Sequence, residues 1–265
     1  LDAHGRTYFG MSQLMTLIKY MKEGLINCED VIYFEDMFQP GIESLPYILD
    51  QIPAQHRPRV FVRCLAQTID PDDFLHVWDM QGFMRKYEEM VNEFVDGVLA
   101  SNEEMVMHAK VAGWNVPMYN ISGLSFGLSE VLSRVPSVTP YDQRAHRISF
   151  ASRWDTEKQP HYFMDFVEKV KQSHPHYVFT LLSGKTLRSN DSSAVDRARQ
   201  LQQNGVLEIA ENISKNRYYE LLNDSRVMVN TALQDWVSNT VSEADALGCN
   251  VLFPAYRSFP EVFAN

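Results

Sequence analysis

Short runs of β-branched and aromatic residues alternate along this chain with longer segments in which apolar residues recur every three or four positions. The short runs are typical of buried strands in a parallel sheet, and the longer segments are typical of helices that cover one. In YFGMSQLMTLIKYMKEG, for example, Leu14, Leu17 and Met21 share one helical face. The pattern predicts strands at 30–34, 57–65, 95–101, 116–120, 147–152, 177–184, 206–210, 226–231 and 250–254, and helices at 8–24, 83–94, 102–114, 160–174, 193–205 and 216–224.

The alternation pauses over residues 121–147, where Gly, Ser and Pro are frequent. A pause of this composition indicates a linker, and we place the domain boundary near Pro140. The chain is therefore predicted to be an α/β protein of two doubly wound, Rossmann-like domains, residues 1–140 and 141–265, which face each other across a cleft. Such sheets bind ligands at the carboxyl ends of their strands, so functional residues are expected in the loops that follow the strands.

Composition narrows the class of protein. The 265 residues are 45% hydrophobic and carry a net charge of −10, which is unlike a nucleic-acid-binding surface rich in Lys and Arg. The three cysteines lie far apart and favour reduced thiols, and no apolar run reaches membrane-spanning length. We therefore expect a cytoplasmic protein. Because the sequence begins at Leu1 and ends soon after SFPEVF, we also expect some terminal elements to be missing from it.

Two cations follow the first predicted strand of the second domain. In SRWDTEK, Arg153 and Lys158 lie in a loop where a diphosphate could be held between them. The alternative is a solvated loop in which Asp155 or Thr156 caps the next helix. The residues alone favour the solvated loop, because basic residues are common in loops.

Two acids, Asp235 and Glu243, flank the predicted start of a helix in DWVSNTVSEADALGC. The helix should begin near residues 238–240, where its free N–H groups would suit an anion, and Glu243 in its first turn could reach the same ligand. The alternative is a capping box of Thr240 and Glu243, which needs no ligand. The spacing alone slightly favours the capping box.

The ordered motifs of residues 147–263 resemble the donor-binding domain of retaining GT-B glycosyltransferases of the family-4-like group. In that family a GR…K element follows the first strand of the domain, and LEAMACG…SLPEV lies near its end. Here SRWDTEK, SEADALGC and SFPEVF take these places in the same order, with YVFTLLSG as the strand that ends in Gly. The family's paired acids fall on Asp235 and Glu243.

The resemblance implies a role for each matched residue. Asp235 would contact the donor sugar, Glu243 would bind the ribose hydroxyls, and Arg153 and Lys158 would offset charge on the leaving diphosphate. The implied catalytic set is Asp235, Arg153 and Lys158, with no protein nucleophile. Backbone groups at the helix start and at neighbouring strand ends complete an implied donor-binding set of Glu243, Val237, Ser238, Asn239, Thr240, Gly184, Asn212, Ile213 and Gly10.

The first half carries the resemblance more weakly. VDGVLASNEEMVMHAKVAG is similar to a strand-Ser-helix element of the family's acceptor domain, and FGMSQL, with Gly10, corresponds to a Gly loop that follows a strand. A His of this domain often touches the sugar in the family. It has no counterpart here, because Ala66, Gln67 and Thr68 follow the second strand.

DPDDF, residues 70–74, contains the Asp-x-Asp pattern that binds a metal–nucleotide complex in the other glycosyltransferase fold. It lies several residues after its strand and includes Pro71, so these acids are predicted to cap a helix. The His residues show no metal-ligand spacing, and no G-x-S-x-G elbow indicates a hydrolase. We expect neither a metal site nor a cofactor.

The resulting prediction is a metal-independent, retaining hexosyl- or pentosyltransferase that uses a nucleotide-diphosphate sugar. Its acceptor is open: a glycan, a lipid, a metabolite or a nucleic-acid base. Two departures matter, because Asp235 is one methylene shorter than the family's Glu and Trp236-Val237 replaces its Gly-Phe. Two alternatives therefore remain: a GT-B-shaped sugar-nucleotide epimerase, and an inactive two-lobed binding protein.

Overall fold

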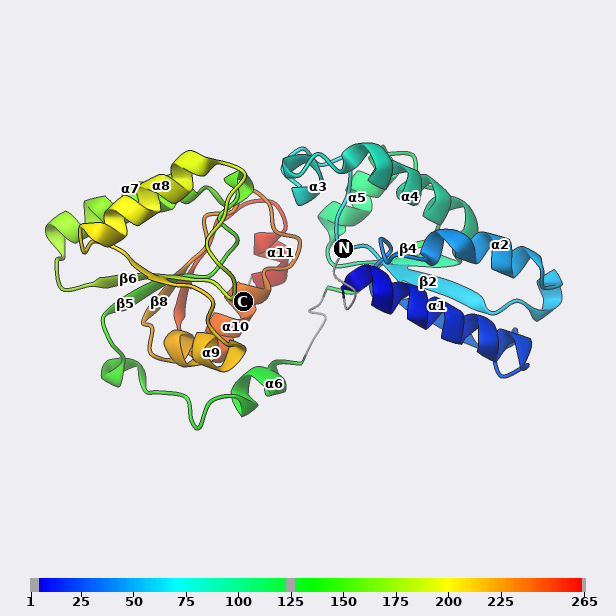
Figure 1. Ribbon diagram of the computed structural model, residues 1–265, viewed down its shortest axis with the longest axis horizontal. Helices are drawn as coiled ribbons and strands as arrows, with labels where there is room; N and C mark the ends of the chain where they lie inside the picture. The colour runs from blue at the N-terminus through cyan, green and yellow to red at the C-terminus, as the bar shows by residue number, and fades with distance from the viewer. Residues whose placement is uncertain (1–4, 123–126, 264–265) are drawn as a thin grey trace. The chain divides into compact units, whose positions relative to one another are not determined.

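The computed structural model describes residues 5–122 and 127–263 and divides into two compact units, Leu1–Ser122 and Gly123–Asn265. Each unit contains one sheet of parallel strands with helices packed against it (Figure 1). Every run that the sequence predicts to be a strand contains one. No described helix combines the length and the apolar character needed to span a bilayer.

Unit 1 has a sheet in the order β1-β2-β3-β4. Its inner positions, such as Val60, Val62 and Val98, are buried, whereas Val31 and Tyr33 of the edge strand β1 are exposed. α4 places Met84 and Val91 in the same core. The elements are α1 (Arg6–Lys22), β1 (Val31–Phe34), α2 (Leu45–Asp50), β2 (Arg59–Arg63), α3 (Phe74–Val77), α4 (Gln81–Phe94), β3 (Gly97–Ala100), α5 (Glu103–Val111) and β4 (Met118–Asn120).

Unit 2 has a sheet in the order β7-β6-β5-β8-β9. The chain therefore builds outward from β5 in one direction and then returns to add β8 on its other side. Among the described strands this reversal, which defines a doubly wound sheet, occurs in unit 2. The elements are α6 (Leu128–Ser133), β5 (Arg147–Phe150), α7 (Pro160–Ser173), β6 (Val178–Leu182), α8 (Ser192–Gln203), β7 (Glu208–Ala210), α9 (Lys215–Asn223), β8 (Val227–Val229), α10 (Asn239–Ala246), β9 (Asn250–Leu252) and α11 (Phe259–Phe263).

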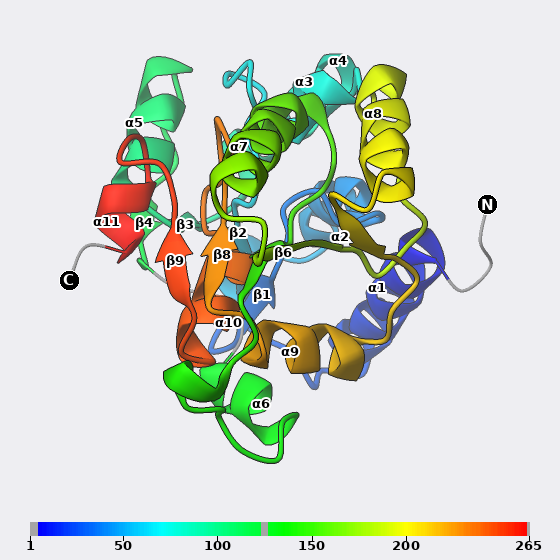
Figure 2. The ribbon, with the colours of Figure 1, turned by 90° about the vertical axis from the view of Figure 1, so that its left-hand side faces the viewer.

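Two apolar layers enclose the sheet of unit 2. On one side α7 and α8 contribute Phe163, Val167 and Leu201. On the other side α9 and α10 contribute Leu222 and Val241. Figure 2 shows α7 and α8 on one side of this sheet and α9 on the other. With both faces covered, the ends of the strands are left as the place where polar loops can gather.

The domain boundary differs from the predicted one. Residues 127–140, which the sequence assigns to the first domain, belong to unit 2, because Val131 and Val135 are buried in the core that also holds Val241. The side chain of Asn223 also accepts from the backbone N–H of Thr139, at 2.9 Å. Residues 123–126 of the predicted linker lie outside the described residues. The short helices α2, α6 and α11 were not predicted, because they have too few turns for a periodic pattern.

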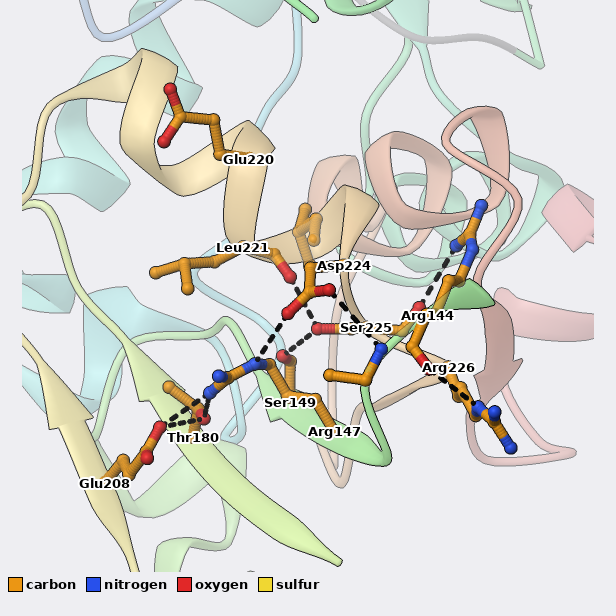
Figure 3. A network of polar contacts seen from close by, with 12 residues as sticks. Arg144, Arg147, Ser149, Thr180, Glu208, Glu220, Leu221, Asp224, Ser225 and Arg226 are labelled. Atoms are coloured by element: carbon orange, nitrogen blue, oxygen red, sulfur yellow. Dashed lines mark hydrogen bonds and ion pairs between the residues drawn. The ribbon is translucent and has the colours of Figure 1, made fainter. Parts of the chain in front are cut away.

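A polar network ties α9 to the amino ends of the neighbouring strands. The Arg147 guanidinium at the start of β5 pairs with Glu208 of β7 at 2.6 Å and with Asp224 after α9 at 3.5 Å. The hydroxyls of Ser149 and Ser225 lie 2.6 Å apart (Figure 3). The network lies at the end of the sheet opposite to the loops that follow the strands, so it supports the fold of unit 2 and leaves those loops for other roles.

The end of α10 is fixed by a buried arginine. Arg144 donates to the carbonyls of Leu247 and Ser225, at 2.5 and 3.0 Å. Gly248 follows the helix in the left-handed region, at a φ of 74°, and a Cβ there would lie 2.8 Å from the Arg144 guanidinium. A glycine is thus required both for the backbone turn that ends α10 and for the approach of Arg144.

Candidate functional site

The candidate site lies where the strand order of unit 2 reverses. β5 and β8 are adjacent parallel strands, with Ile148 opposite Val227, so their carboxyl ends meet at one edge of the sheet. The loop after β5 carries Arg153 and Lys158, and the loop after β8 carries Asp235. In open α/β sheets, ligands bind outside the carboxyl ends of the strands at such a reversal point.

The loop after β5 brings the two predicted cations together but gives each a carboxylate partner. The exposed Arg153 guanidinium lies 2.8 Å from the buried carboxylate of Glu157. Lys158 is buried, donates to the carbonyl of Gln234 at 2.7 Å, and lies 3.7 Å from a carboxylate oxygen of Asp235. The solvated-loop alternative is therefore wrong for Lys158.

Glu157 is the unusual acid of this loop. Burial raises the pKa of its carboxyl group, and the nearby Arg153 and Lys158 partly offset that rise. A buried carboxylate is destabilised unless a cation pairs with it, so the Glu157 carboxylate accounts for the position of the Arg153 guanidinium. Asp155 is the N-cap of the short turn that follows, but its side chain makes no cap bond to that turn. It accepts instead from the backbone N–H of Asn190, at 3.1 Å.

The loop after β8 is bonded directly to the loop after β5. The Thr231 hydroxyl donates to the carbonyl of Lys158, at 2.6 Å, and the Leu233 N–H donates to the carbonyl of Glu157, at 2.7 Å. The side chain of Asp235 is 23% exposed, so its carboxylate can reach solvent while it stays beside Lys158. The two loops therefore form one structure at the reversal point.

α10 starts at the predicted place. Its first residue is Asn239 and its N-cap is Ser238, which is buried and makes no side-chain cap bond. The Ser238 hydroxyl instead accepts from the side-chain amide of Asn230, at 2.9 Å. Val237 precedes the cap, and Thr240 is the second helical residue. The first turn of an α-helix has N–H groups without helical partners, and these suit an anion.

Glu243 does not lie in the first turn of α10, where the sequence placed it. It is the fifth residue of α10 and so lies in the second turn. Its buried carboxylate accepts from Lys215 at 2.7 Å, from Tyr218 at 2.7 Å and from Tyr219 at 2.9 Å, all of them on α9. The capping box with Thr240 is wrong, because Ser238 is the N-cap and Glu243 bonds to another helix. Asp235 and Glu243 thus have separate partners.

The α9 residues around Glu243 were not identified from the sequence. The Lys215 ammonium lies 4.5 and 4.7 Å from the ring centroids of Tyr218 and Tyr219. Burial first, and then the Glu243 carboxylate, raises the pKa of both tyrosine hydroxyls. Both hydroxyls donate to the Glu243 carboxylate, which favours their protonated form. The KNRYY sequence gives no local sign of this, since its partner is 24 or more residues further on.

Three predicted donor-binding residues come together at the carboxyl ends of β6 and β7. The Ile213 N–H donates to the carbonyl of Ser183, at 3.3 Å, and Asn212 donates to that of Lys185, at 3.4 Å. A Cβ at Gly184 would lie 3.9 Å from the carbonyl oxygen of Ile213. Asn212 has a φ of 56°, which fits a tight turn. Gly184, Asn212 and Ile213 thus lie together in the loops after β6 and β7, and β6 is the neighbour of β5 in the sheet.

Gly10 does not lie in a loop, contrary to the sequence prediction. It is inside α1 of unit 1, where a Cβ would lie 2.4 Å from the carbonyl oxygen of Pro40. Close packing against that carbonyl accounts for the glycine without a ligand. The predicted helix cap in DPDDF is confirmed, since the Asp73 side chain accepts from the N–H of Leu75 at the start of α3. Across residues 5–122 and 127–263, no three His, Cys, Asp or Glu side chains are grouped as metal ligands.

The chain matches no protein-family model and no curated protein. It is similar to solved structures. OtsA in its apo form has a TM-score of 0.66 and 12% identity, over 95% of this chain and 64% of its own. Sucrose-phosphate synthase from Thermosynechococcus elongatus has a TM-score of 0.61 and 12% identity, over 94% and 62%. Anabaena HepE in complex with UDP and glucose has a TM-score of 0.62 and 12% identity, over 97% and 65%.

The chain spans less than two thirds of the length of each of these three proteins. At 12% identity the likeness concerns the fold. Two parallel-sheet α/β units, with the strand reversal in the second, agree with it. The chain therefore has the GT-B fold, as the resemblance of its sequence to GT-B glycosyltransferases predicts.

Proposed function

We propose that this chain transfers a sugar from a nucleotide-diphosphate sugar to an acceptor. The observation that carries the proposal is the meeting of Lys158, Asp235 and the start of α10 at the reversal point of unit 2. A cation, a partly exposed carboxylate and free helical N–H groups at such a point suit a ligand with both a diphosphate and hydroxyl groups.

The diphosphate would bind at the start of α10 and beside Lys158. Because the Lys158 ammonium is 3.7 Å from Asp235, a phosphate that approaches Lys158 also frees the Asp235 carboxylate for the sugar hydroxyls. The ribose would reach Glu243 through one hydroxyl. Three donors already occupy that carboxylate, and a carboxylate offers about four acceptor positions.

The chemistry follows from this arrangement. The bond between the sugar C1 and the diphosphate oxygen breaks, and a bond from C1 to the acceptor oxygen forms. Charge that develops on the leaving diphosphate is stabilised by Lys158 and the helix start, which is electrostatic catalysis. The acceptor attacks C1 from the face that the diphosphate leaves, and a donor phosphate oxygen takes the acceptor's proton. The transfer therefore retains the configuration at C1 and needs no protein nucleophile. The proposal includes independence from divalent metal and a cytoplasmic location.

A uridine nucleotide is the first donor to test. Anabaena HepE is described in complex with UDP-glucose, the pneumococcal O-GlcNAc transferase GtfA in complex with UDP and GlcNAc, and trehalose-6-phosphate from E. coli bound with UDP-2-fluoro glucose. These are ligands of those proteins. They support UDP-glucose and UDP-GlcNAc as the first probes for this chain.

An inactive binding protein is the second candidate, and one observation favours it. Trp236 is buried directly after Asp235, where the resembling family has Gly, and the Arg257 guanidinium lies 5.6 Å from its ring centroid. A bulky, fixed side chain here would narrow the space beside the diphosphate. Such a protein would bind the nucleotide and release no sugar.

The test combines calorimetric titration of UDP with measurement of sugar release from UDP-glucose and UDP-GlcNAc, with and without acceptors. Glu243→Gln should weaken UDP binding about tenfold, since a hydrogen bond to a charged group contributes about 1.5–3 kcal/mol. Asp235→Asn should lower transfer and leave UDP binding nearly unchanged. Asp245→Asn is the matched control, because Asp245 is an exposed acid of the same helix.

Each outcome separates the candidates. Transfer that requires an acceptor supports the proposed function, conversion of the donor into its epimer without release of sugar indicates an epimerase, and binding without turnover indicates an inactive protein. A wild-type chain that binds no nucleoside diphosphate contradicts the proposal as a whole.

A further inference from the structure

Four consecutive backbone carbonyls in the loop after β8 each accept a hydrogen bond from a side chain outside the loop. Tyr256 donates to Ala232 at 2.8 Å, and Arg257 donates to Leu233 at 3.4 Å. Lys158 donates to Gln234 at 2.7 Å, and Ser258 donates to Asp235 at 2.6 Å. The main chain that carries Asp235 is therefore held at every residue from 232 to 235.

Three of these donors are consecutive residues in the connection between β9 and α11. We call Tyr256, Arg257 and Ser258 the carbonyl clamp. β8 lies between β5 and β9 in the sheet. The loop after β9 therefore reaches the loop after β8 from one side, and the loop after β5, which carries Lys158, reaches it from the other. The carbonyls are thus held from both sides: by Lys158 on one and by the carbonyl clamp on the other.

The backbone of the clamp is adapted to this task. Arg257 has a φ of 56°, a conformation that favours glycine and costs a residue with a side chain. A turn alone would be made more easily by glycine. The arginine side chain gives the turn two further contacts, with the carbonyl of Leu233 and with the face of Trp236 at 5.6 Å. Both contacts lie on the loop that carries Asp235.

We propose that Tyr256, Arg257 and Ser258 are positioning residues of the donor site, which fix the Asp235 carboxylate beside Lys158. This inference rests on the proposed function. The reason is geometric: Ser258 bonds to the carbonyl of Asp235 itself, and Tyr256 and Arg257 hold the carbonyls of Ala232 and Leu233, which lie three and two residues before it. The clamp acts through the backbone, so it should affect the sugar step more than the binding of the nucleotide.

The other reading is that the clamp only secures the β9–α11 connection to unit 2. It predicts a lower melting temperature on substitution and unchanged kinetic constants well below that temperature. Three variants distinguish the readings. Tyr256→Phe removes one hydroxyl, Ser258→Ala removes another from a buried site, and Arg257→Gly removes the guanidinium while it relieves the backbone conformation.

The measurements are kcat and KM for UDP-glucose or UDP-GlcNAc, whichever the wild type turns over, together with calorimetric titration of UDP and a thermal melt. Small misplacement of a reacting group can lower a rate by about a hundredfold. We expect kcat to fall about tenfold or more in Ser258→Ala and Arg257→Gly, with the Kd for UDP changed by less than about threefold. Tyr162→Phe is the control, because Tyr162 is an exposed tyrosine of α7.

Variants that melt earlier but keep wild-type kcat and UDP affinity at 25 °C would overturn the positioning role and leave the proposed function intact. If Ser258→Ala fails to fold, Arg257→Gly decides the matter, since Arg257 is only partly buried. A wild-type chain that turns over neither donor would overturn this inference together with the proposed function.

Discussion

The contact between Glu243 and α9 offers a stringent test of the structure. Glu243→Ala removes the acceptor of three donors and so probes the bond between α9 and α10. Glu243→Ala, Tyr219→Phe and the double variant form a cycle that isolates one of these bonds. The capping box that the sequence favoured makes a different prediction for the same variants, because it involves no residue of α9.

The magnitude follows from burial. Glu243→Ala leaves the hydroxyls of Tyr218 and Tyr219 without their acceptor, at about 1–3 kcal/mol for each unsatisfied buried group. Lys215 is half-exposed and regains water, so it adds little. The higher helix propensity of Ala offsets less than about 1 kcal/mol of this loss in stability. We expect unit 2 to lose about 2–5 kcal/mol of its free energy of unfolding.

The cycle predicts a change of sign. In the wild type, Tyr219→Phe should cost about 1.5 kcal/mol, the value of a hydrogen bond to a charged group. In the Glu243→Ala background the same substitution removes an unsatisfied hydroxyl, so it should cost nothing or stabilise. Urea denaturation followed by far-UV circular dichroism measures all four free energies.

Two results would refute this reasoning. One is a loss of only about 1 kcal/mol in Glu243→Ala, the value of a helix cap. The other is a coupling energy between Glu243 and Tyr219 within about 0.5 kcal/mol of zero, as expected for residues without contact. Either would mean that Glu243 acts within its own helix.

Alkaline pH tests the same cluster without substitution. Burial and the Glu243 carboxylate raise the pKa of Tyr218 and of Tyr219 above the ordinary tyrosine value. The folded state then keeps protons that the unfolded state loses, so stability is full below about pH 10 and falls as the pH rises beyond it. Glu243→Gln should make this fall shallower, because it removes one cause of the raised pKa. Denaturation midpoints between pH 8 and 11 measure it.

Three further predictions concern the candidate site and its corrections. UDP affinity should be the same in EDTA and in Mn²⁺, and a tenfold gain with metal, measured by calorimetry, would contradict the metal-independent proposal. Lys158→Met and Arg153→Ala should each weaken UDP binding more than uridine binding. The loss of UDP affinity should be about tenfold for Lys158→Met and smaller for the exposed Arg153. Equal effects on both ligands would show that neither residue contacts the diphosphate. Gly10→Ala should destabilise unit 1 by about 1–3 kcal/mol, because its Cβ would meet the Pro40 carbonyl, whereas Gly82→Ala in α4, where the Cβ has open space, should be neutral or stabilising. Thermal melts of the two glycine variants check the last prediction.

Local pattern was enough for most of the fold. The buried strands are short apolar runs, and the longer helices repeat their apolar face over several turns, so each element is determined by residues within itself. The start of α10 and the cap at Asp73 were likewise set by near neighbours in the chain. The helices that escaped prediction, such as α6, have fewer than two full turns and owe their place to packing.

The surroundings of the candidate site depended on residues far apart in the sequence. The sequence alone placed Lys158 and Asp235 in the loops after two strands, because those positions follow from the alternation of strands and helices. Only the tertiary structure decided that Lys158 faces Asp235, that Glu243 bonds to α9, and that residues 256–258 hold the carbonyls of residues 232–235. It also moved the unit boundary, because Val131 is buried among residues of α10 more than 100 positions further on. The physical reason is that secondary structure follows from short-range sterics and periodic burial, whereas a side chain's partners depend on which strands the sheet brings side by side.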